Sequence, residues 1–362
     1  MKQNKLREKI TEQFIAALQE DKMPWHAMWF TARPVNAISD KKYKGVNSLW
    51  LSFVADYMGY KDHRWCTFKQ ASEQGWHVKK GEHASQIEYW YLYDKVQKKS
   101  IDQREARKII SDDPTREKDI ILTCRTYSVF NGDQIEGIPE LEIVSSSKVD
   151  IDSVRAQRDI LLKNMGLAFR ERGSEAYYTP TADRITMPPD TFFVDSYGYM
   201  STFLHECGHA TGHESRLNRD LSGRFGSEEY AKEELRAEIA SAFTSQALGF
   251  GRGDSDLSGA LNNHKAYIQS WIKAIQDQPT ELFAAIKDAE KISDYLLEKG
   301  EFLKEVGLEP EEMEVHDSVS SAKSISTKKP SLDNQLNKAE IIKGEIPSGK
   351  VARRFFEETV IR

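Results

Sequence analysis

Apolar residues near the start of the chain recur at helical spacing. Leu6, Ile10 and Phe14 fall close to a 3.6-residue period within residues 5–21, which predicts an amphipathic helix that ends before Pro24. Similar but shorter patterns predict two further helices in this part of the chain, over residues 48–57 and 67–74.

Two later segments, residues 85–96 and 120–130, are rich in β-branched and aromatic residues. This composition predicts strands, and we expect the two segments to pair. Residues 97–119 between them are highly charged and contain few large apolar side chains, so we expect a hairpin tip or a mobile insertion there. Together with the preceding helices, these segments predict an α+β domain.

The second half of the chain is predicted to be mainly helical. Four helical patterns cover residues 149–164, 192–211, 228–249 and 259–298. An extended segment with a turn, residues 176–187, separates the first pattern from the second.

Two changes of composition predict the domain boundaries. Residues 144–148 contain three consecutive serines, and from about residue 309 the chain is rich in Ser and Lys with few large apolar residues. At roughly 150 residues per domain, 362 residues indicate two domains. We predict domains over residues 1–145 and 149–308, followed by a disordered linker and tail over residues 309–362.

The composition argues against several classes of protein. No run of about 18 apolar residues is present, so no membrane-spanning helix and no membrane partner are expected. The first 14 residues are polar and charged, unlike the apolar core of a secretory signal. Cys66, Cys124 and Cys207 are odd in number and widely spaced, which is typical of a reduced protein. We therefore expect a cytoplasmic protein.

The net charge of −6 conceals an asymmetry along the chain. The first 100 residues carry 17 Lys and Arg against 11 Asp and Glu, a net charge of +6, so the remaining 262 residues carry −12. Six of the seven tryptophans also lie in the first 100 residues. A basic, aromatic end and an acidic end indicate two separate functions.

The sharpest chemical signal is an H-E-x-x-H motif that runs from His205 to His209. On a helix, residues four apart share a face, so both imidazoles can bind one metal ion. Glu206 can then reach a water molecule at that metal and act as its general base. Two imidazoles suit zinc, so the motif predicts a zinc metallopeptidase. The alternative is a surface helix whose histidines are merely solvated.

A catalytic zinc needs a third protein ligand. Position 215, where one class of zinc peptidase has histidine, is Ser215, and His213 lies just past the expected end of the helix. A glutamate from the next predicted helix is therefore favoured. Glu238 lies among alanines on the expected apolar face and is the preferred ligand, whereas Glu234 is an alternative ligand or a support for the ligands. The remaining glutamates near the start of that helix, Glu229 and Glu233, are interpreted as first-turn charges.

The basic end of the chain has the composition of a single-stranded-DNA-binding surface. Aromatic rings stack on bases and basic side chains follow the phosphates, and here both kinds of residue lie close together in sequence. The alternative for the tryptophans is burial in a core, which we expect for Trp50 and Trp90. The candidate DNA-binding residues are Trp25, Trp29, Arg33, Lys42, Tyr43, Lys44, Trp65, Lys69, Lys79 and Lys80.

Several motifs resemble one family, the ArdC-type antirestriction proteins. The H-E-x-x-H helix, the G-H-x-x-R-L-x-R segment and the block FGSEEYAKEELRAE resemble the zincin-like metallopeptidase domain of that family. The segments P-W-H-x-x-W, YKGVN and WCTFKQA resemble its N-terminal single-stranded-DNA-binding domain, which adds Asn47 to the candidates for DNA contact. The resemblance covers roughly residues 5–300. Arg236 departs from it, because an aliphatic residue is expected there.

The resemblance implies an antirestriction protein of a mobile element transferred by conjugation. An N-terminal α+β domain would bind single-stranded DNA, and a mainly helical zincin-like domain would cleave an unidentified protein substrate. His205, His209 and Glu238 would hold one zinc ion or another divalent metal, with Glu206 as the catalytic base. The alternatives are a DNA-binding protein with a structural or vestigial metal site, and a metalloprotease effector directed at a host protein.

Overall fold

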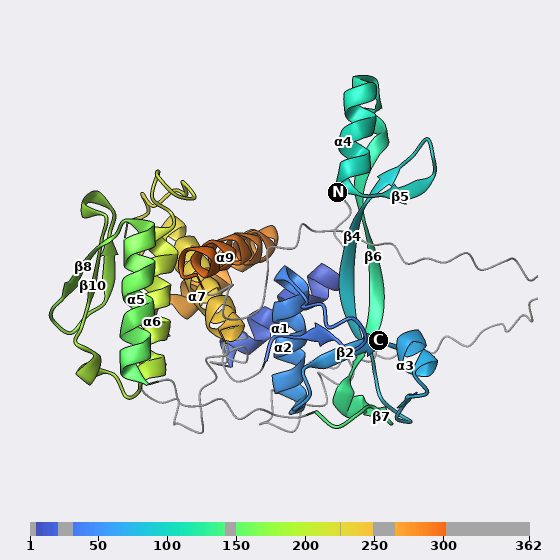
Figure 1. Cartoon of the computed structure of the whole chain (residues 1–362), viewed down its shortest axis with the longest axis horizontal. Helices are drawn as coiled ribbons and strands as arrows, with labels where there is room; N and C mark the ends of the chain where they lie inside the picture. Colours follow the sequence, from blue (N-terminus) through green and yellow to red (C-terminus); the bar gives the residue numbers. More distant parts are fainter. Residues whose placement is uncertain (1–4, 21–31, 142–149, 225, 249–264, 302–362) are drawn as a thin grey trace, which may run out of the picture. The chain divides into compact units, whose positions relative to one another are not determined.

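The chain has a mixed α+β fold, as the sequence predicts (Figure 1). The computed structural model describes residues 5–20, 32–141, 150–224, 226–248 and 265–301. Trp25, Trp29, the predicted linker over residues 144–148 and the predicted tail over residues 309–362 lie outside these ranges. Within them, no helix combines the length and the hydropathy that a membrane span requires.

The three helices predicted near the start of the chain are all present. Helix α1 buries one side of its surface, including Leu6, Ile10 and Phe14. Helix α2 ends at Gly59, whose left-handed backbone suits a residue without a side chain. Thr67 caps the start of α3 by accepting a hydrogen bond from the Gln70 backbone. Their bounds are Lys5–Gln19 for α1, Gly45–Met58 for α2 and Phe68–Glu73 for α3.

A five-stranded sheet has the order β1-β2-β6-β4-β5. Strands β4 and β6 are neighbours, which confirms the expected pairing of residues 85–96 with residues 120–130. Strand β2 runs antiparallel to β6, with Trp65 opposite Asn131. The bounds are Val35–Asn36 for β1, Arg64–Thr67 for β2, Ser85–Asp94 for β4, Lys99–Ile101 for β5 and Ile120–Asn131 for β6. A separate ladder joins β3 (His77–Val78) to β7 (Ile135–Glu136).

An ion pair connects α1 to β4. The Arg7 guanidinium donates to both carboxylate oxygens of Glu88, at 2.7 and 2.8 Å, and the Trp90 indole also donates to Glu88 at 2.8 Å. The prediction that Trp90 is a core residue was wrong, because 45% of its surface is exposed. Its hydrogen bond to Glu88 holds the ring at the edge of this ion pair. Trp50 is buried, as expected.

Residues Tyr91–Thr123 belong to a second compact unit and are more ordered than the sequence indicated. The expected hairpin tip or mobile insertion contains β5, helix α4 (Gln103–Asp112) and a 3-10 helix over Pro114–Asp119. Asp102 caps α4 through the Glu105 backbone, and Arg116 donates to both oxygens of the fully buried Asp94 at 2.7 Å. Polar interactions of this kind leave no hydrophobic periodicity, so the sequence pattern missed them.

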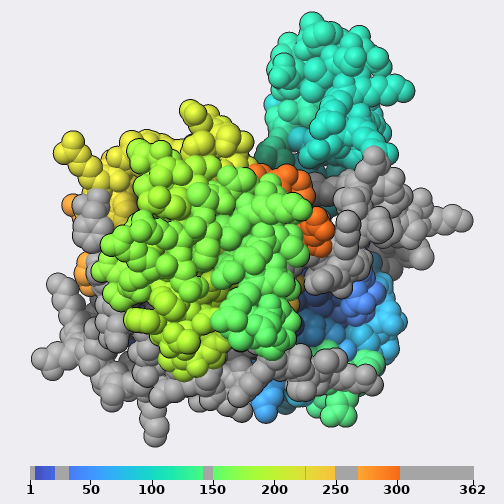
Figure 2. All heavy atoms as spheres, turned by 60° about the vertical axis from the view of Figure 1, so that its left-hand side comes forward, coloured from blue at the N-terminus to red at the C-terminus, as the bar shows by residue number. Residues whose placement is uncertain are grey.

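The second half of the chain is built in layers (Figure 1). A three-stranded sheet of order β8-β10-β9 contacts α6, which packs between α5 on one side and α7 on the other. Helix α9 packs along α7 and also contacts α5 and α6, and α8 packs against both α7 and α9. In Figure 2 the green to yellow-green residues of α5, the small sheet and their connections form one continuous face. The bounds are Ile151–Met165 for α5, Ala168–Glu171 for β8, Tyr177–Thr179 for β9, Arg184–Met187 for β10, Ser196–Ala210 for α6, Glu228–Ala247 for α7, Lys265–Asp277 for α8 and Thr280–Lys299 for α9.

Helices α6 and α7 approach closely at a glycine. A Cβ atom added to Gly208 would lie 3.3 Å from both the Cα and the Cβ of Ala237. That distance is tighter than ordinary van der Waals contact, so the contact depends on a residue without a side chain on α6 and a small one on α7.

We expect Gly208→Val to force α6 away from α7. The added methyl groups would overlap the α7 backbone, and overpacking of this kind costs roughly 1–3 kcal/mol of folding free energy. Gly208→Ala should have a smaller effect. Chemical denaturation measures the difference, and Thr202→Val on the same helix controls for the helix propensity of valine. Equal stability of Gly208→Val and Thr202→Val would show that the close approach is unimportant.

Candidate metal centre and nucleic-acid surface

The two histidines of the H-E-x-x-H motif lie on one face of α6, as predicted. Asp195 caps the start of the helix by accepting a hydrogen bond from the Gly198 backbone at 2.7 Å. One turn separates His205 from His209, and their Nε2 atoms lie 3.1 Å apart. Tyr199, Phe203, Leu204 and Cys207 are fully buried and fix the orientation of the helix.

Glu234 of α7 brings a carboxylate to both imidazoles. Its Oε2 atom lies 3.4 Å from His205 Nε2, and its Oε1 atom lies 3.4 Å from His209 Nε2. The three potential ligand atoms lie within 4.8 Å of one another. Two imidazole nitrogens and one carboxylate are a donor set that zinc uses in catalytic sites. This group therefore fits a divalent cation.

The structure favours Glu234 over Glu238 as the third ligand, contrary to the preference drawn from sequence. Glu238 lies one turn further along α7, where its Oε2 atom is 3.1 Å from Nδ1 of His205, the ring nitrogen that faces away from the cluster. An ionised carboxylate only accepts hydrogen bonds, so this Nδ1 donates its proton and Nε2 is left for a metal. Glu238 thus orients a ligand.

Glu233 has the same relation to His209. Its Oε1 atom lies 3.4 Å from His209 Nδ1, and Arg219 donates to both of its carboxylate oxygens at 2.6 and 3.2 Å. Arg219 also donates to the Gly208 carbonyl at 2.8 Å and to the Thr211 hydroxyl at 2.7 Å. Glu233 is therefore a buried partner of the site. The prediction from sequence that it is a first-turn charge was wrong.

The surrounding carboxylates favour the protonated form of both imidazoles by raising their pKa values. Burial lowers the pKa of His209, but hydrogen bonds with Glu233 and Glu234 outweigh burial and raise this pKa to about 9. The pKa of His205 is raised well above its usual range for the same reason, through Glu234 and Glu238. A cation that binds the Nε2 atoms must displace these protons, so metal binding and proton release are coupled.

Glu206 lies at the same site, and burial and the two imidazoles have opposite effects on the pKa of its carboxyl group. Its carboxylate is 7% exposed, and this burial raises its pKa. The imidazoles of His205 and His209 and a hydrogen bond from the Tyr178 backbone act in the opposite direction. The hydrogen bond shows that strand β9 borders the site. Arg216 fixes this strand by donating to the Tyr178 hydroxyl at 3.2 Å and by pairing with Asp183 in the turn to β10.

The candidate DNA-binding residues fall into three groups. Lys44, Lys69, Lys79 and Lys80 are exposed, and Lys42, Tyr43 and Asn47 are partly buried. Two other candidates are buried, which corrects the expectation that they face DNA. Trp65 is fully buried beneath the sheet, and the Arg33 side chain is 7% exposed.

Two of these side chains have structural partners. Arg33 donates to the Tyr43 carbonyl at 2.9 Å and to Glu290 of α9 at 2.5 Å. Asn47 exchanges two hydrogen bonds with the backbone of Glu88, at 2.7 and 2.9 Å. Both side chains hold the fold together, which a motif alone does not reveal.

An exposed aromatic pair on the sheet was missed by the sequence reasoning. Tyr89 of β4 and Tyr127 of β6 are 39% and 41% exposed, and their rings meet edge to face with centroids 5.8 Å apart. Trp90 is exposed nearby along β4. The signal in the sequence is the aromatic run around residue 90, which was interpreted only as a strand, with Trp90 as a core residue because tryptophan is usually buried.

We expect Glu234→Gln to abolish tight metal binding and Glu238→Gln to weaken it only about 10- to 100-fold, the usual effect of losing a partner that orients a ligand. The reason is that Glu234 faces both Nε2 atoms, whereas Glu238 faces Nδ1. Titration of the metal-free protein with zinc against a competing chelator measures both affinities. Glu229→Gln, an exposed position on the same helix, is the matched control. A larger loss for Glu238→Gln would make Glu238 the ligand.

Comparison with known proteins identifies the family of both parts of the chain. Residues 4–130 match the N-terminal domain of the anti-restriction factor ArdC, and residues 156–288 match a zincin-like metallopeptidase. The chain is 35% identical over 298 residues to the uncharacterized protein y4eC of Sinorhizobium fredii and covers 90% of its length. It is also 39% and 37% identical to two DNA primases TraC of Escherichia coli, but spans only 20% and 27% of their lengths.

Two solved structures of the antirestriction protein ArdC are also similar to the chain. The crystal structure of the antirestriction protein ArdC from the R388 plasmid, in its metal-free form, matches with a TM-score of 0.61 at 30% identity. The match covers 82% of this chain and 98% of that one, and a Mn(II)-bound structure of ArdC matches with the same score. The chain belongs to the ArdC antirestriction family and contains a zincin-like domain.

Proposed function

We propose that the chain is an antirestriction protein of a mobile element that both binds single-stranded DNA and hydrolyses peptide bonds. The observation that carries the peptidase half is the convergence of His205, His209 and Glu234 beside the buried carboxylate of Glu206. Zinc bound by such a ligand set polarises a carbonyl and activates water for attack.

Glu206 supplies the proton transfers in this proposal. Burial raises the pKa of its carboxyl toward the range where a general base works, while the neighbouring imidazoles keep it from rising further. The Tyr178 backbone holds the carboxylate in place. Glu206 would take the proton from the attacking water and deliver it to the departing amine, so one residue serves both steps of hydrolysis.

We expect Glu206→Gln to lower the rate of peptide hydrolysis by about 100-fold or more, because glutamine cannot accept the proton. The bound metal should remain, since Glu206 is not one of the three converging ligands. Cleavage of an unstructured protein substrate measures the rate, and elemental analysis measures the metal content.

Glu214→Gln, an exposed residue shortly after the same helix, is the control and should behave like the unchanged protein. Full activity of Glu206→Gln would rule out this site as the source of hydrolysis. Antirestriction that survives Glu206→Gln in cells would favour the alternative in which the metal site is structural or vestigial and DNA is protected by occupancy alone.

The DNA-binding half of the proposal rests on the match to the ArdC N-terminal domain and on the exposed groups of this part of the chain. Lys44, Lys69, Lys79 and Lys80 offer positive charge for phosphates. The Tyr89–Tyr127 pair offers exposed rings on which bases can stack, a mode of binding that does not require a particular sequence.

We expect Tyr127→Ala to weaken binding to a thymine oligonucleotide by about 1–3 kcal/mol, the usual contribution of one stacked base. Tyr127→Phe keeps the ring and should bind nearly as well as the unchanged protein. Fluorescence anisotropy at two salt concentrations measures the affinity. Phe192→Ala, a 65% exposed aromatic in the zincin-like part, is the control. Equal loss for Tyr127→Phe and Tyr127→Ala would exclude stacking.

A further inference from the structure

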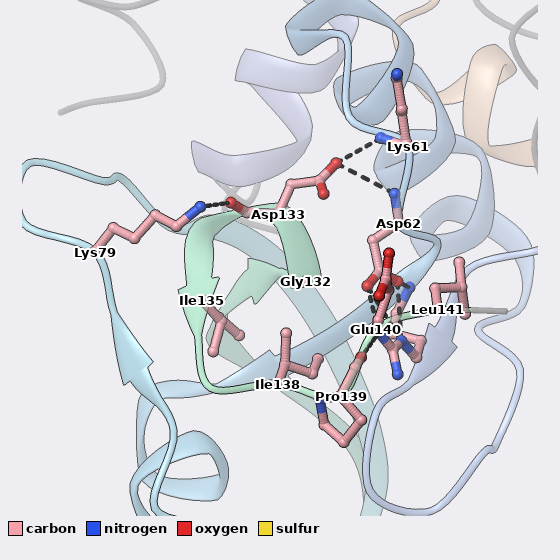
Figure 3. A pocket seen from close by; sticks show the side chains of 11 residues that line it. Lys61, Asp62, Lys79, Gly132, Asp133, Ile135, Ile138, Pro139, Glu140 and Leu141 are labelled. Atoms are coloured by element: carbon pink, nitrogen blue, oxygen red, sulfur yellow. Dashed lines mark hydrogen bonds and ion pairs between the residues drawn. The ribbon is translucent and has the colours of Figure 1, made fainter. Parts of the chain in front are cut away.

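An open pocket of about 280 Å³ lies beside β7, in the part of the chain that matches the ArdC N-terminal domain and the segment just after it (Figure 3). Its walls come from three residues before and within β2, from Lys79 after β3, and from seven residues around β7. They are Lys61, Asp62, Arg64, Lys79, Gly132, Asp133, Ile135, Ile138, Pro139, Glu140 and Leu141. Pockets that bind small molecules range from roughly 300 to 1,000 Å³. This pocket lies at the lower end of that range, so it has room for one flat ring system but not for a base pair.

One wall of the pocket is apolar and held in place. Ile135, Ile138 and Pro139 face the cavity from the segment that follows β6 (Figure 3). Ile135 belongs to a buried cluster with Cys66. The Pro139 carbonyl accepts a hydrogen bond from Arg64 at 2.7 Å, which fixes the turn that carries this wall.

Two of the charged residues around the pocket already have partners. Asp62 is 7% exposed and accepts a two-fold hydrogen bond from the guanidinium of Arg64, at 3.0 and 2.7 Å. The Asp133 carboxylate accepts hydrogen bonds from the backbone N–H groups of Lys61 and Asp62, at 2.5 and 3.2 Å. The pocket is therefore rigid on this side.

The remaining charges have the pattern of a nucleotide site. Lys79 places an exposed ammonium group at the rim and donates to the Asp133 carbonyl at 2.7 Å, whereas the Lys61 side chain points away from the pocket (Figure 3). Glu140 is exposed and lies beside the apolar wall. A cation suits a phosphate, an apolar wall suits the face of a base, and a carboxylate suits neighbouring N–H donors on a base edge.

We propose that this pocket binds a nucleotide, with guanine as the preferred base. Guanine presents a ring N–H beside an amino group, which together can donate to both oxygens of Glu140, whereas thymine has no such pair. Lys79 then contacts the phosphate. This inference rests on the proposed binding of single-stranded DNA and adds a base preference to it.

The test compares a thymine oligonucleotide with the same oligonucleotide that carries one guanine, by fluorescence anisotropy. The unchanged protein should bind the guanine-containing strand between about 5-fold and 100-fold more tightly, the usual range for one two-fold hydrogen bond to a base. Glu140→Gln should remove this preference, so that the two strands bind with equal affinity. Glu136→Gln, an exposed neighbour that does not line the pocket, should keep the preference.

Lys79 is tested by the salt dependence of binding. Replacing Lys79 by alanine should reduce the slope of log affinity against log salt by about 0.7, the contribution of one phosphate contact on a single strand. Competition by dGMP distinguishes the source of the nucleotide. Displacement of the guanine-containing strand shows that the pocket also accepts a free nucleotide, and failure of dGMP to displace it assigns the pocket to the strand.

Different results would contradict the binding of single-stranded DNA and the guanine preference of the pocket. If neither oligonucleotide bound at all, the proposed binding of single-stranded DNA would be wrong. If both bound equally, or if Glu140→Gln kept the guanine preference, the protein would still bind DNA but the pocket would have no part in reading it.

Discussion

The close contact between α6 and α7 at Gly208 and Ala237 is the constraint on which the metal site depends. Carboxylate and imidazole groups must approach within a few ångströms to share a cation, and side chains of ordinary size between the two helix backbones would prevent that. Because the contact falls between His205 and His209, the alanine-rich face of α7 brings its glutamates to both imidazoles. The layers around these helices, α9 on one side and the small sheet on the other, hold the pair together.

Close approach also concentrates charge. Four buried or nearly buried glutamates surround the two histidines, namely Glu206, Glu233, Glu234 and Glu238. With both imidazoles protonated and Arg219 included, the positive charges still fall short of the negative ones by one. Burying uncompensated charge is costly. A divalent cation held by His205, His209 and Glu234 would replace the two protons without changing this balance. The glutamates that face Nδ1 then fix each ring in the orientation that a metal requires.

Most of the fold was predictable because its longer elements carry hydrophobic periodicity. The H-E-x-x-H motif was also predictable, since spacing of four on a helix fixes the shared face without any knowledge of packing. The choice between Glu234 and Glu238 as metal ligand was not predictable, because both lie on one face of α7. Only the offset of α6 and α7 along their axes decides which of them reaches both Nε2 atoms. The predictions that Arg33 and Trp65 contact DNA were wrong for a related reason. Their residue types suit DNA, but burial and a carboxylate 257 positions away decided their role.

That distant carboxylate also changes the meaning of the charge asymmetry. Glu290 of α9 accepts hydrogen bonds from Arg33 and from the Gly45 backbone at the start of α2, and Asp294 lies 3.9 Å from Lys44. Part of the excess positive charge at the start of the chain is therefore matched by the acidic remainder within the molecule. The net charge of +6 overstates what a nucleic acid would encounter, and the proposed binding of DNA would rely more on exposed rings and on the remaining lysines. The same ion pairs place the segment around Arg33 and Lys44 directly on α9, which packs against α7, so the proposed DNA-binding part and the metal-site helices are in contact through α9.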